Sequence, residues 1–340
     1  MRAAYCTQPG RFEIREVEQP VAAPGEAIIK VRSCGICGSD LHFFQGALPP
    51  PSVCPGHEIS GEVIEVGDGA RVRPGDRVAV EPLVVCRECS YCRTGDYHLC
   101  KQYRILGMML DGGFADYLRM PSYALFPLPA NVDFEVGSLT EPLSVAVHAV
   151  RVANLCLGAR VVVLGAGTIG LLSVAAAKAA GAADVWITAR HPQQRAAAES
   201  LGATRVFMGA DASGGLLDLA QRHPVDVVIE TVAGTADTIN EALLLVRPGG
   251  WVAVLGLFSG MPRLNALLLV AKEVRIVGSQ TYGRSGPRAD FDVALQLLSA
   301  EPERFRRIIT HRFALDEITR GFETAADKRS RSIKVAIRPA

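Results

Sequence analysis

Charge of one sign is not in excess in this chain, and long hydrophobic runs are absent from its sequence. Its 340 residues carry 36 Lys and Arg against 35 Asp and Glu, which gives a formal net charge of +1. This balance excludes the basic footprint of a nucleic-acid-binding protein and an acidic tail. No apolar run approaches the ~20 residues that span a bilayer, and the first residues lack the apolar core of a secretory signal. We therefore expect a cytoplasmic protein that binds neither nucleic acid nor a membrane.

Aromatic residues are also scarce, at 6%, but the hydrophobic fraction of 49% is ample for sizeable cores. A chain of 340 residues exceeds what one core usually serves, so two domains are expected. The nine cysteines are an odd number, which fits a disulfide framework poorly. Four of them crowd into one short segment, where metal ligation is the better expectation in a reducing compartment.

The texture of the sequence changes near residue 143. The preceding part has short β-branched runs punctuated by Pro and Gly, which predicts a small β-rich domain; the runs are Glu26–Val31, Ile59–Val66 and Arg77–Val80. Strands then alternate with helices, and the expected strands are Arg160–Leu164, Asp184–Thr188, Asp226–Glu230 and Trp251–Leu255. Such alternation is typical of a parallel, doubly wound sheet, so we predict an α/β fold. After about Thr281 the chain is mixed again.

A glycine-rich segment, Gly165-Ala166-Gly167-Thr168-Ile169-Gly170, follows a predicted strand and opens a predicted helix. In this setting the three glycines have separate roles. The first permits a tight turn, the second admits a pyrophosphate, and the third lets helix and strand pack closely. The pyrophosphate would bind at the helix N-terminus, where free amide groups favour an anion. The alternative is an ordinary glycine-rich turn between strand and helix.

The end of the next strand predicts which dinucleotide binds. An NAD site normally carries Asp or Glu there to hold the ribose hydroxyls. Here the strand runs into Ala189 and Arg190, with Arg195 shortly after. A carboxylate that would repel a 2′-phosphate is missing, and guanidinium groups that could bind it are present. The sequence therefore favours NADP(H) over NAD(H). Alternatively, Arg190 stacks on the adenine or points to solvent.

Four cysteines with short, regular spacing form the most specific pattern in the chain: Cys86, Cys89, Cys92 and Cys100. Four thiolates can close a tetrahedral shell around Zn²⁺ and leave no open position for chemistry. We expect a structural zinc that stabilises a loop with little core of its own. The alternative is a set of buried free thiols.

A second set of candidate ligands is scattered along the chain. Cys37 lies in a Cys-Gly-Ile-Cys-Gly-Ser-Asp stretch, His57 and Glu58 are adjacent, and Glu141 comes much later. Thiolate, imidazole and carboxylate together suit zinc, and three protein ligands leave one position open for a substrate. Cys34 and Cys37 could instead be a redox pair, although the strand-then-helix setting of such a pair is missing. Each residue alone is more often structural, so the hypothesis depends on their joint occurrence.

Over essentially its whole length the chain resembles the medium-chain zinc-dependent dehydrogenases, in their sorbitol and threonine dehydrogenase branch. The resemblance includes both cysteine patterns, the Gly-His-Glu at Gly56, the Glu-Pro-Leu at Glu141, the glycine loop, Thr310–Phe313, and Lys334 with Val335. It implies a GroES-like catalytic domain over residues 1–142 and 282–340, with a Rossmann domain over 143–281. It also implies a homodimer or homotetramer that acts on an alcohol, a polyol or a ketone.

For the site, the resemblance implies that Cys37, His57 and Glu141 hold a catalytic zinc, with Glu58 beside it as a direct or alternating ligand. Zinc would lower the pKa of the substrate hydroxyl. Ser39 would accept the proton as a catalytic residue and His42 would relay it to water. Two zinc ions per chain are thus expected. The expected cofactor contacts also include Leu255, Gly256, Ser279 and Gln280.

The substrate is not named by these residues, although we expect Phe43, Phe44 and Gln280–Arg288 to line its pocket. Two rival hypotheses remain. The quinone reductase branch shares the fold but lacks these metal ligands. A zinc- and NADPH-binding redox sensor without turnover would not need the pairing of Ser39 with His42.

Overall fold

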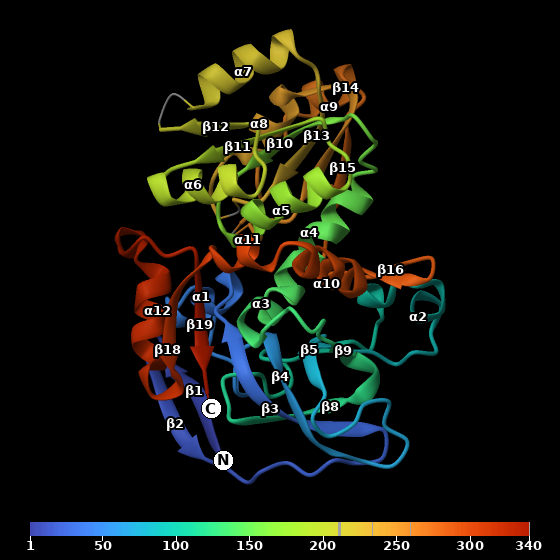
Figure 1. Ribbon diagram of the computed structural model, residues 1–340. Helices are drawn as coiled ribbons and strands as arrows, with labels where there is room; N and C mark the ends of the chain where they lie inside the picture. The colour runs from blue at the N-terminus through green and yellow to red at the C-terminus, as the bar shows by residue number, and fades with distance from the viewer. Residues whose placement is uncertain (210–211, 233, 259, 340) are drawn as a thin grey trace. The chain divides into compact units, whose positions relative to one another are not determined.

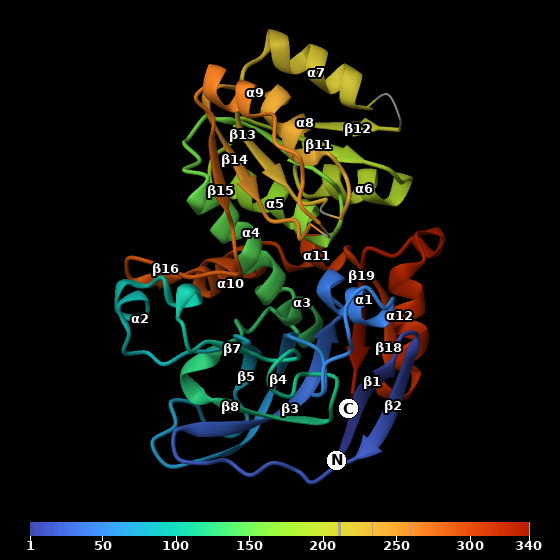
Figure 2. The ribbon, with the colours of Figure 1, turned by 180° about the vertical axis from the view of Figure 1, so that it is seen from behind.

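The computed structural model describes residues 1–209, 212–232, 234–258 and 260–339 (Figure 1; Figure 2 shows the reverse view). The chain divides into two compact units. One combines Met1–Glu141 with Gly283–Ala340, and the other is the continuous segment Pro142–Tyr282. No helix among the described residues is both long and apolar enough to cross a membrane.

A mixed seven-stranded sheet forms the centre of the first unit. Its strand order is β18-β19-β3-β4-β5-β9, and β8 also pairs with β3. The strands are β3 (Glu26–Gly35), β4 (Glu58–Val66), β5 (Arg77–Val80), β8 (Tyr117–Pro121), β9 (Leu125–Pro127), β18 (Ile309–Ala314) and β19 (Lys334–Arg338). Antiparallel pairing of β19 with β3 sets Ala336 opposite Gly35. The last strand, β19, therefore lies beside β3 from the first part of the chain, as both views show.

The core of this unit packs on that sheet. β3 is rich in β-branched side chains, and Ile28 and Ile29 are both fully buried, so the strand is covered on both faces. Phe12 packs against Phe322 with a ring-centroid distance of 4.5 Å, and Phe44 lies 5.2 Å from Phe322. Such tilted aromatic pairs add to the free energy gained by burial.

Further strands and helices complete the first unit. The strands are β1 (Arg2–Gln8), β2 (Arg11–Glu16), β6 (Leu83–Val84), β7 (Arg104–Ile105), β16 (Arg284–Ser285) and β17 (Arg288–Ala289). The helices are α1 (Gly38–Phe44), α2 (Ser90–Thr94), α3 (Phe134–Ser138), α10 (Asp290–Ala300), α11 (Pro302–Arg306) and α12 (Ile318–Ala326). Of these, α1, α2 and α3 directly adjoin the candidate metal ligands.

The second unit is a six-stranded parallel sheet with the order β12-β11-β10-β13-β14-β15. The strands are β10 (Arg160–Leu164), β11 (Asp184–Ala189), β12 (Arg205–Met208), β13 (Val225–Glu230), β14 (Val246–Val254) and β15 (Arg275–Gly278). The helices are α4 (Thr140–Val152), which begins in the first unit, α5 (Thr168–Ala179), α6 (Pro192–Ser200), α7 (Ala212–Arg222), α8 (Thr238–Leu245) and α9 (Ala266–Ala271). Strands added outward on both sides of β10 define a doubly wound dinucleotide-binding sheet, which confirms the predicted α/β class.

The two edge strands of this sheet, β12 and β15, are missing from the sequence-based prediction. Their side chains are half-buried or exposed, because an edge strand has a neighbour on one side only. Each is also only four residues long, so it stands out little from the flanking sequence. β14 also begins at Val246, ahead of the predicted Trp251. The intervening Pro248 and Gly249 favour a turn in the sequence, and the strand absorbs them with a shift in its register with β13.

Candidate functional site

Cys37, His57 and Glu58 converge in the first unit, each offering a ligand atom within 4.8 Å of the others. Cys37 is the N-cap residue of α1, and Glu58 is the first residue of β4. β3 and β4 pair at this end through Gly35 and Glu58, which brings the two segments together. His57 and Glu58 are buried and Cys37 is half-buried. A thiol, an imidazole and a carboxylate at this spacing form a donor set suited to zinc.

Asp40 stands behind His57 and Cys37. Its carboxylate accepts a hydrogen bond of 2.9 Å from the backbone N–H of Cys37, and its other oxygen lies 3.7 Å from Nδ1 of His57. Burial lowers the pKa of His57, but Asp40 and Cys37 outweigh this and raise it well above its usual value. The Asp40–His57 contact is thus electrostatic, without a hydrogen bond between the two side chains. Sequence reasoning gives Asp40 no role, and its place three residues after the helix N-cap was the available signal.

Glu58 forms a buried ion pair with Lys334 of β19. The Lys334 ammonium lies 2.6 Å from each oxygen of Glu58 and donates a hydrogen bond of 2.9 Å to the Ile36 carbonyl. Burial lowers the pKa of Lys334, but Glu58 and Cys37 reverse the effect and raise it. Lys334 is thus a charged member of the site. In the sequence it stands out only through the family resemblance, since 276 positions separate it from Glu58.

Glu141 lies in the first turn of α4 and is buried. Among the described residues, the cluster of ligand atoms within 4.8 Å does not include it. Its charge still helps to raise the pKa of His57. Burial raises the pKa of Glu141 to about 7, although His57 acts in the opposite direction. The structure therefore brings together three of the four residues of the predicted catalytic metal site and leaves the fourth nearby.

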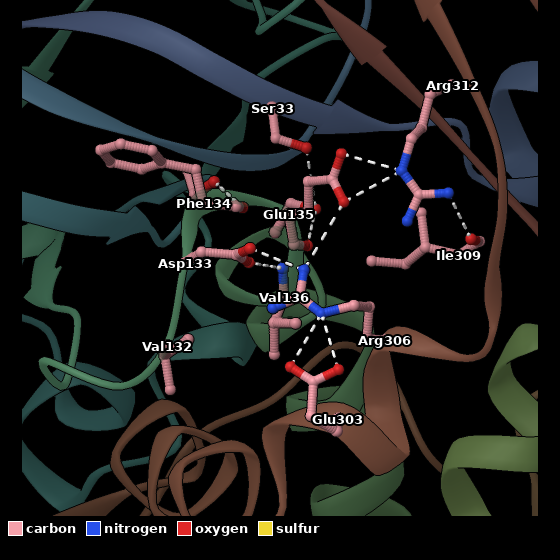
Figure 3. Close-up of polar contacts among 12 residues, drawn as sticks. Ser33, Val132, Asp133, Phe134, Glu135, Val136, Glu303, Arg306, Ile309 and Arg312 are labelled. Carbon is pink, nitrogen blue, oxygen red and sulfur yellow. Dashed lines mark hydrogen bonds and ion pairs between the residues drawn. The ribbon is translucent and has the colours of Figure 1, made fainter.

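An ion-pair network around the buried Glu135 holds α3, the helix that directly precedes Glu141 (Figure 3). Both carboxylate oxygens of Glu135 accept a hydrogen bond of 3.0 Å from Arg312 Nε, and the Arg306 guanidinium lies 3.7 Å from Glu135 Oε2. Arg306 also binds Asp133, the N-cap residue of α3, at 2.6 Å. Because both arginines come from the end of the chain, the network ties that end to the segment that carries Glu141.

Ser39 and His42 lie three residues apart on α1 and are both half-buried. Side chains at this spacing share one face of a helix. Phe43 is half-buried on the same helix, whereas Phe44 is buried in the aromatic cluster described above. Phe44, expected at the substrate pocket, thus packs in the core instead, because its rotation about the helix axis turns it toward Phe12 and Phe322.

The four remaining candidate ligands form a separate cluster between β6 and β7. The sulfur atoms of Cys86, Cys89, Cys92 and Cys100 lie within 4.8 Å of one another, and all four are free thiols. Cys86 Sγ is 3.5 Å from Cys100 Sγ and 3.8 Å from Cys92 Sγ. A tetrahedron with Zn–S bonds of about 2.3 Å has edges of about 3.8 Å. Backbone N–H groups of Glu88 and Cys89 lower the pKa of Cys86 to about 6, whereas burial and the neighbouring thiols raise the pKa of Cys92 to about 12.

The glycine loop of the second unit has the geometry that its sequence predicts. Gly165 follows β10 with φ of 96°, a left-handed conformation that favours glycine. A Cβ at Gly170 would lie 1.9 Å from the Gly165 carbonyl, so only glycine fits there. Gly167 caps α5, and a Cβ there would meet nothing within 4 Å. Open space beside the first amide groups of a helix is where a phosphate can approach.

The other expected cofactor contacts follow the same ends of the parallel strands. Ala189 ends β11, and the remaining ones come directly after β14 and β15: Leu255, Gly256, Ser279 and Gln280. Ligands of doubly wound sheets bind at these carboxyl ends. Arg190 is exposed, whereas the guanidinium of Arg195 pairs with Glu199 at 2.9 Å along α6. Arg195 is thus already engaged on its own helix.

Comparison with known proteins supports both units. Residues 23–130 match the alcohol dehydrogenase GroES-like domain, and residues 168–300 match the zinc-binding dehydrogenase domain. Sorbitol dehydrogenase of Bacillus subtilis is 32% identical over 100% of this chain and 97% of its own. L-Threonine 3-dehydrogenase of Pyrococcus horikoshii is 35% identical over 95% and 94%.

Among solved structures, a zinc-binding dehydrogenase from Sinorhizobium meliloti bound to NADP is similar, with a TM-score of 0.86 and 32% identity over 99% of both chains. Similarity of this extent reaches both units, the one with the metal-type donor sets and the one with the glycine loop. The chain therefore belongs to the medium-chain zinc-dependent alcohol and polyol dehydrogenases, a family of oxidoreductases that includes the sorbitol and threonine enzymes.

Proposed function

We propose that the protein interconverts a secondary alcohol or polyol and its ketone, using NADP(H) as the hydride acceptor or donor. The observation that carries the proposal is the convergence of Cys37, His57 and Glu58 within 4.8 Å, the last two of them buried, in a chain that also holds a dinucleotide-type glycine loop. A structural role alone would not require three different metal-binding groups at one buried point.

The proposed metal content is two zinc ions per chain. Cys37, His57 and Glu141 would hold the catalytic ion, with Glu58 as a direct or alternating ligand, and the four-cysteine cluster would hold the structural one. When bound, the catalytic ion supplies Lewis acidity and NADP supplies the redox capacity. Asp40 would orient the His57 ring through Nδ1.

The proton of the substrate hydroxyl would move through α1. Ser39 Oγ would accept it, and His42 would pass it on to water from the same face of the helix. Half-burial of both side chains supports this route, since one end must meet substrate and the other must meet solvent.

The preference for NADP(H) is proposed from two observations. Ala189 stands where an NAD site would carry a carboxylate, and Arg190 is exposed directly after it. Of the similar solved structures, one holds NADP and another holds NADH. A charge-assisted hydrogen bond to a 2′-phosphate contributes ~1.5–3 kcal/mol. Arg195 would contribute less, because Glu199 already pairs with it.

The decisive experiment is a spectrophotometric screen of polyols, diols and simple ketones with both cofactors. The zinc-loaded protein should turn over at least one polyol or ketone, faster with NADP(H), and protein stripped of metal by a chelator should not. Cofactor binding without turnover of any substrate would replace the proposal with a redox sensor.

The proposal also covers the domains and the assembly. Residues 1–142 with 282–340 would form the catalytic domain, and residues 143–281 would form the dinucleotide-binding domain. The protein would be a cytoplasmic homo-oligomer. Size-exclusion chromatography tests the oligomer.

A further inference from the structure

Two threonine side chains hold the glycine loop of the second unit from its two sides. Thr188 lies near the end of β11 and Thr231 directly follows β13, and these two strands flank β10 in the sheet. The backbone N–H of Gly165 donates a hydrogen bond of 2.9 Å to Oγ1 of Thr188. The hydroxyl of Thr231 donates to the carbonyl oxygen of Leu164 at 2.8 Å and lies 3.3 Å from that of Gly165. Both backbone polar groups of Gly165 therefore have a threonine hydroxyl as partner.

These hydroxyls take over where the strand ladder ends. β10 ends at Leu164, and its pairing with β11 and β13 goes no further, so the ladder supplies no partner for Gly165. Backbone donors and acceptors that leave a sheet need other partners unless they face water. Gly165 also has φ of 96°, and glycine by itself does little to fix a turn, because it is the most permissive residue. The two threonines therefore supply the restraint that the glycine lacks.

The hydroxyl of Thr231 lies at the centre of the glycine motif. A Cβ at Gly165 would lie 3.0 Å from Thr231 Oγ1, and a Cβ at Gly170 would lie 2.9 Å from the same atom. The first and third glycines of the loop thus leave room for this hydroxyl. The second, Gly167, is the N-cap residue of α5 and makes no side-chain capping hydrogen bond. Because α5 begins directly after this turn, the direction of its first amide groups, where a phosphate can bind, depends on how the turn is held.

We propose that Thr188 and Thr231 are positioning residues for the dinucleotide, which fix the turn at Gly165 so that the N-terminus of α5 meets the pyrophosphate. This inference rests on the proposed dinucleotide site, and it adds to that site two residues outside the glycine motif. Both cofactors contain the same pyrophosphate. Loss of either hydroxyl should therefore weaken NADPH and NADH equally, unlike a change at Arg190.

Isothermal titration calorimetry of the zinc-loaded protein tests the proposal. Thr231→Val removes the hydroxyl at nearly constant volume and should weaken NADPH, NADH and ADP-ribose at least ~5-fold, the loss expected for one hydrogen bond. Adenosine 2′-phosphate contains no pyrophosphate, and its affinity should stay within about twofold. Thr188→Val should give the same pattern, and it decides the matter if Thr231→Val does not fold. Thr231→Ser keeps the hydroxyl and should bind all four ligands within about twofold of wild type.

Thr204→Val is the matched control. Oγ1 of Thr204 makes a similar double contact, at 3.1 Å with both the N–H and the carbonyl oxygen of Val185, near the opposite end of β11. This variant should leave all four affinities within about twofold of wild type.

Unchanged affinity for NADPH and NADH in both Thr188→Val and Thr231→Val overturns the proposal. An equal loss in Thr204→Val, or an equal loss for adenosine 2′-phosphate, also overturns it, since the threonines would then act only through general stability. Cofactor binding without turnover in wild type would instead count against the proposed function alone.

Discussion

The two cysteine-containing clusters of the first unit differ in nearly every physical respect. Cys37 shares its cluster with the imidazole of His57 and the carboxylate of Glu58, both of which are buried. Asp40 lies beside His57, and Lys334 pairs with Glu58. The Cys86 cluster has four equivalent thiols, three of them half-buried, on a loop between two-residue strands. Mixed donors with charged support suit a site whose coordination changes during chemistry. Four thiols suit a site that stays closed.

The largest difference between the two clusters is expected for replacement of His57. Replacing it with Ala removes the imidazole of the first cluster, and turnover should fall below ~0.1% of wild type, because Lewis acidity is worth several kcal/mol. NADPH affinity should stay within about twofold, since the glycine loop belongs to the other unit. Steady-state kinetics and fluorescence titration measure the two effects. A variant that keeps most of its turnover with added zinc would refute the catalytic assignment.

A second test removes the proposed proton acceptor. Ser39→Ala should lower kcat about 10²-fold, at the lower end of the range for general acid–base steps. Ser39→Thr is the matched control, because it keeps a hydroxyl at the same position of α1. Equal turnover in the Ala variant and wild type would show that the proton leaves by another route.

The contact between Asp40 and His57 should affect zinc binding in the mixed cluster only. Asp40→Asn weakens the electrostatic partner of His57 Nδ1, and zinc affinity at that site should fall ~10–100-fold. Competition with a chromophoric chelator measures the loss in two separate phases, one per site. If the tighter, four-cysteine phase shifts instead, the two clusters are not independent.

The second unit offers a readout that neither cluster should affect. Ala189→Asp restores the ribose acceptor of an NAD site and should reverse a roughly tenfold preference for NADPH, since ~1.4 kcal/mol is a factor of ten. Arg190→Ala should remove the preference without creating one for NADH. Titration of both cofactors against both variants decides this. Equal affinity of wild type for NADH and NADPH would assign Arg190 another role.

The smallest effect on chemistry is expected in the four-cysteine cluster. Cys92→Ser should lower the zinc content from two per chain to one and lower Tm by at least ~2–4 °C, the shift that 1 kcal/mol produces. Turnover per folded molecule should be retained, because the substrate does not meet this site. Elemental analysis and differential scanning calorimetry provide the numbers. Unchanged zinc content would remove the structural-zinc assignment.

Local patterns were enough for the parts of this protein that are continuous in sequence. The four cysteines at short spacing and the glycine loop each lie within 15 residues, so their chemistry could be predicted from spacing alone. The central strands β10, β11 and β13 each carry three or four consecutive buried apolar residues, which made them predictable from the sequence. Edge strands β12 and β15 could not be predicted, because what makes them strands is a neighbour rather than their own pattern.

The sequence by itself determined the α/β class, the four-cysteine cluster and the dinucleotide loop, because short-range spacing sets turn geometry and the available donor atoms. Only the tertiary structure decided which carboxylates stand near the mixed cluster and in what state. It placed Glu58 against Lys334 across 276 positions, set Asp40 behind His57, and left Glu141 outside the 4.8 Å cluster. The contact between Glu58 and Lys334 depends on β19 joining the sheet beside β3, and strand pairing between distant segments is fixed by the packing of the whole core.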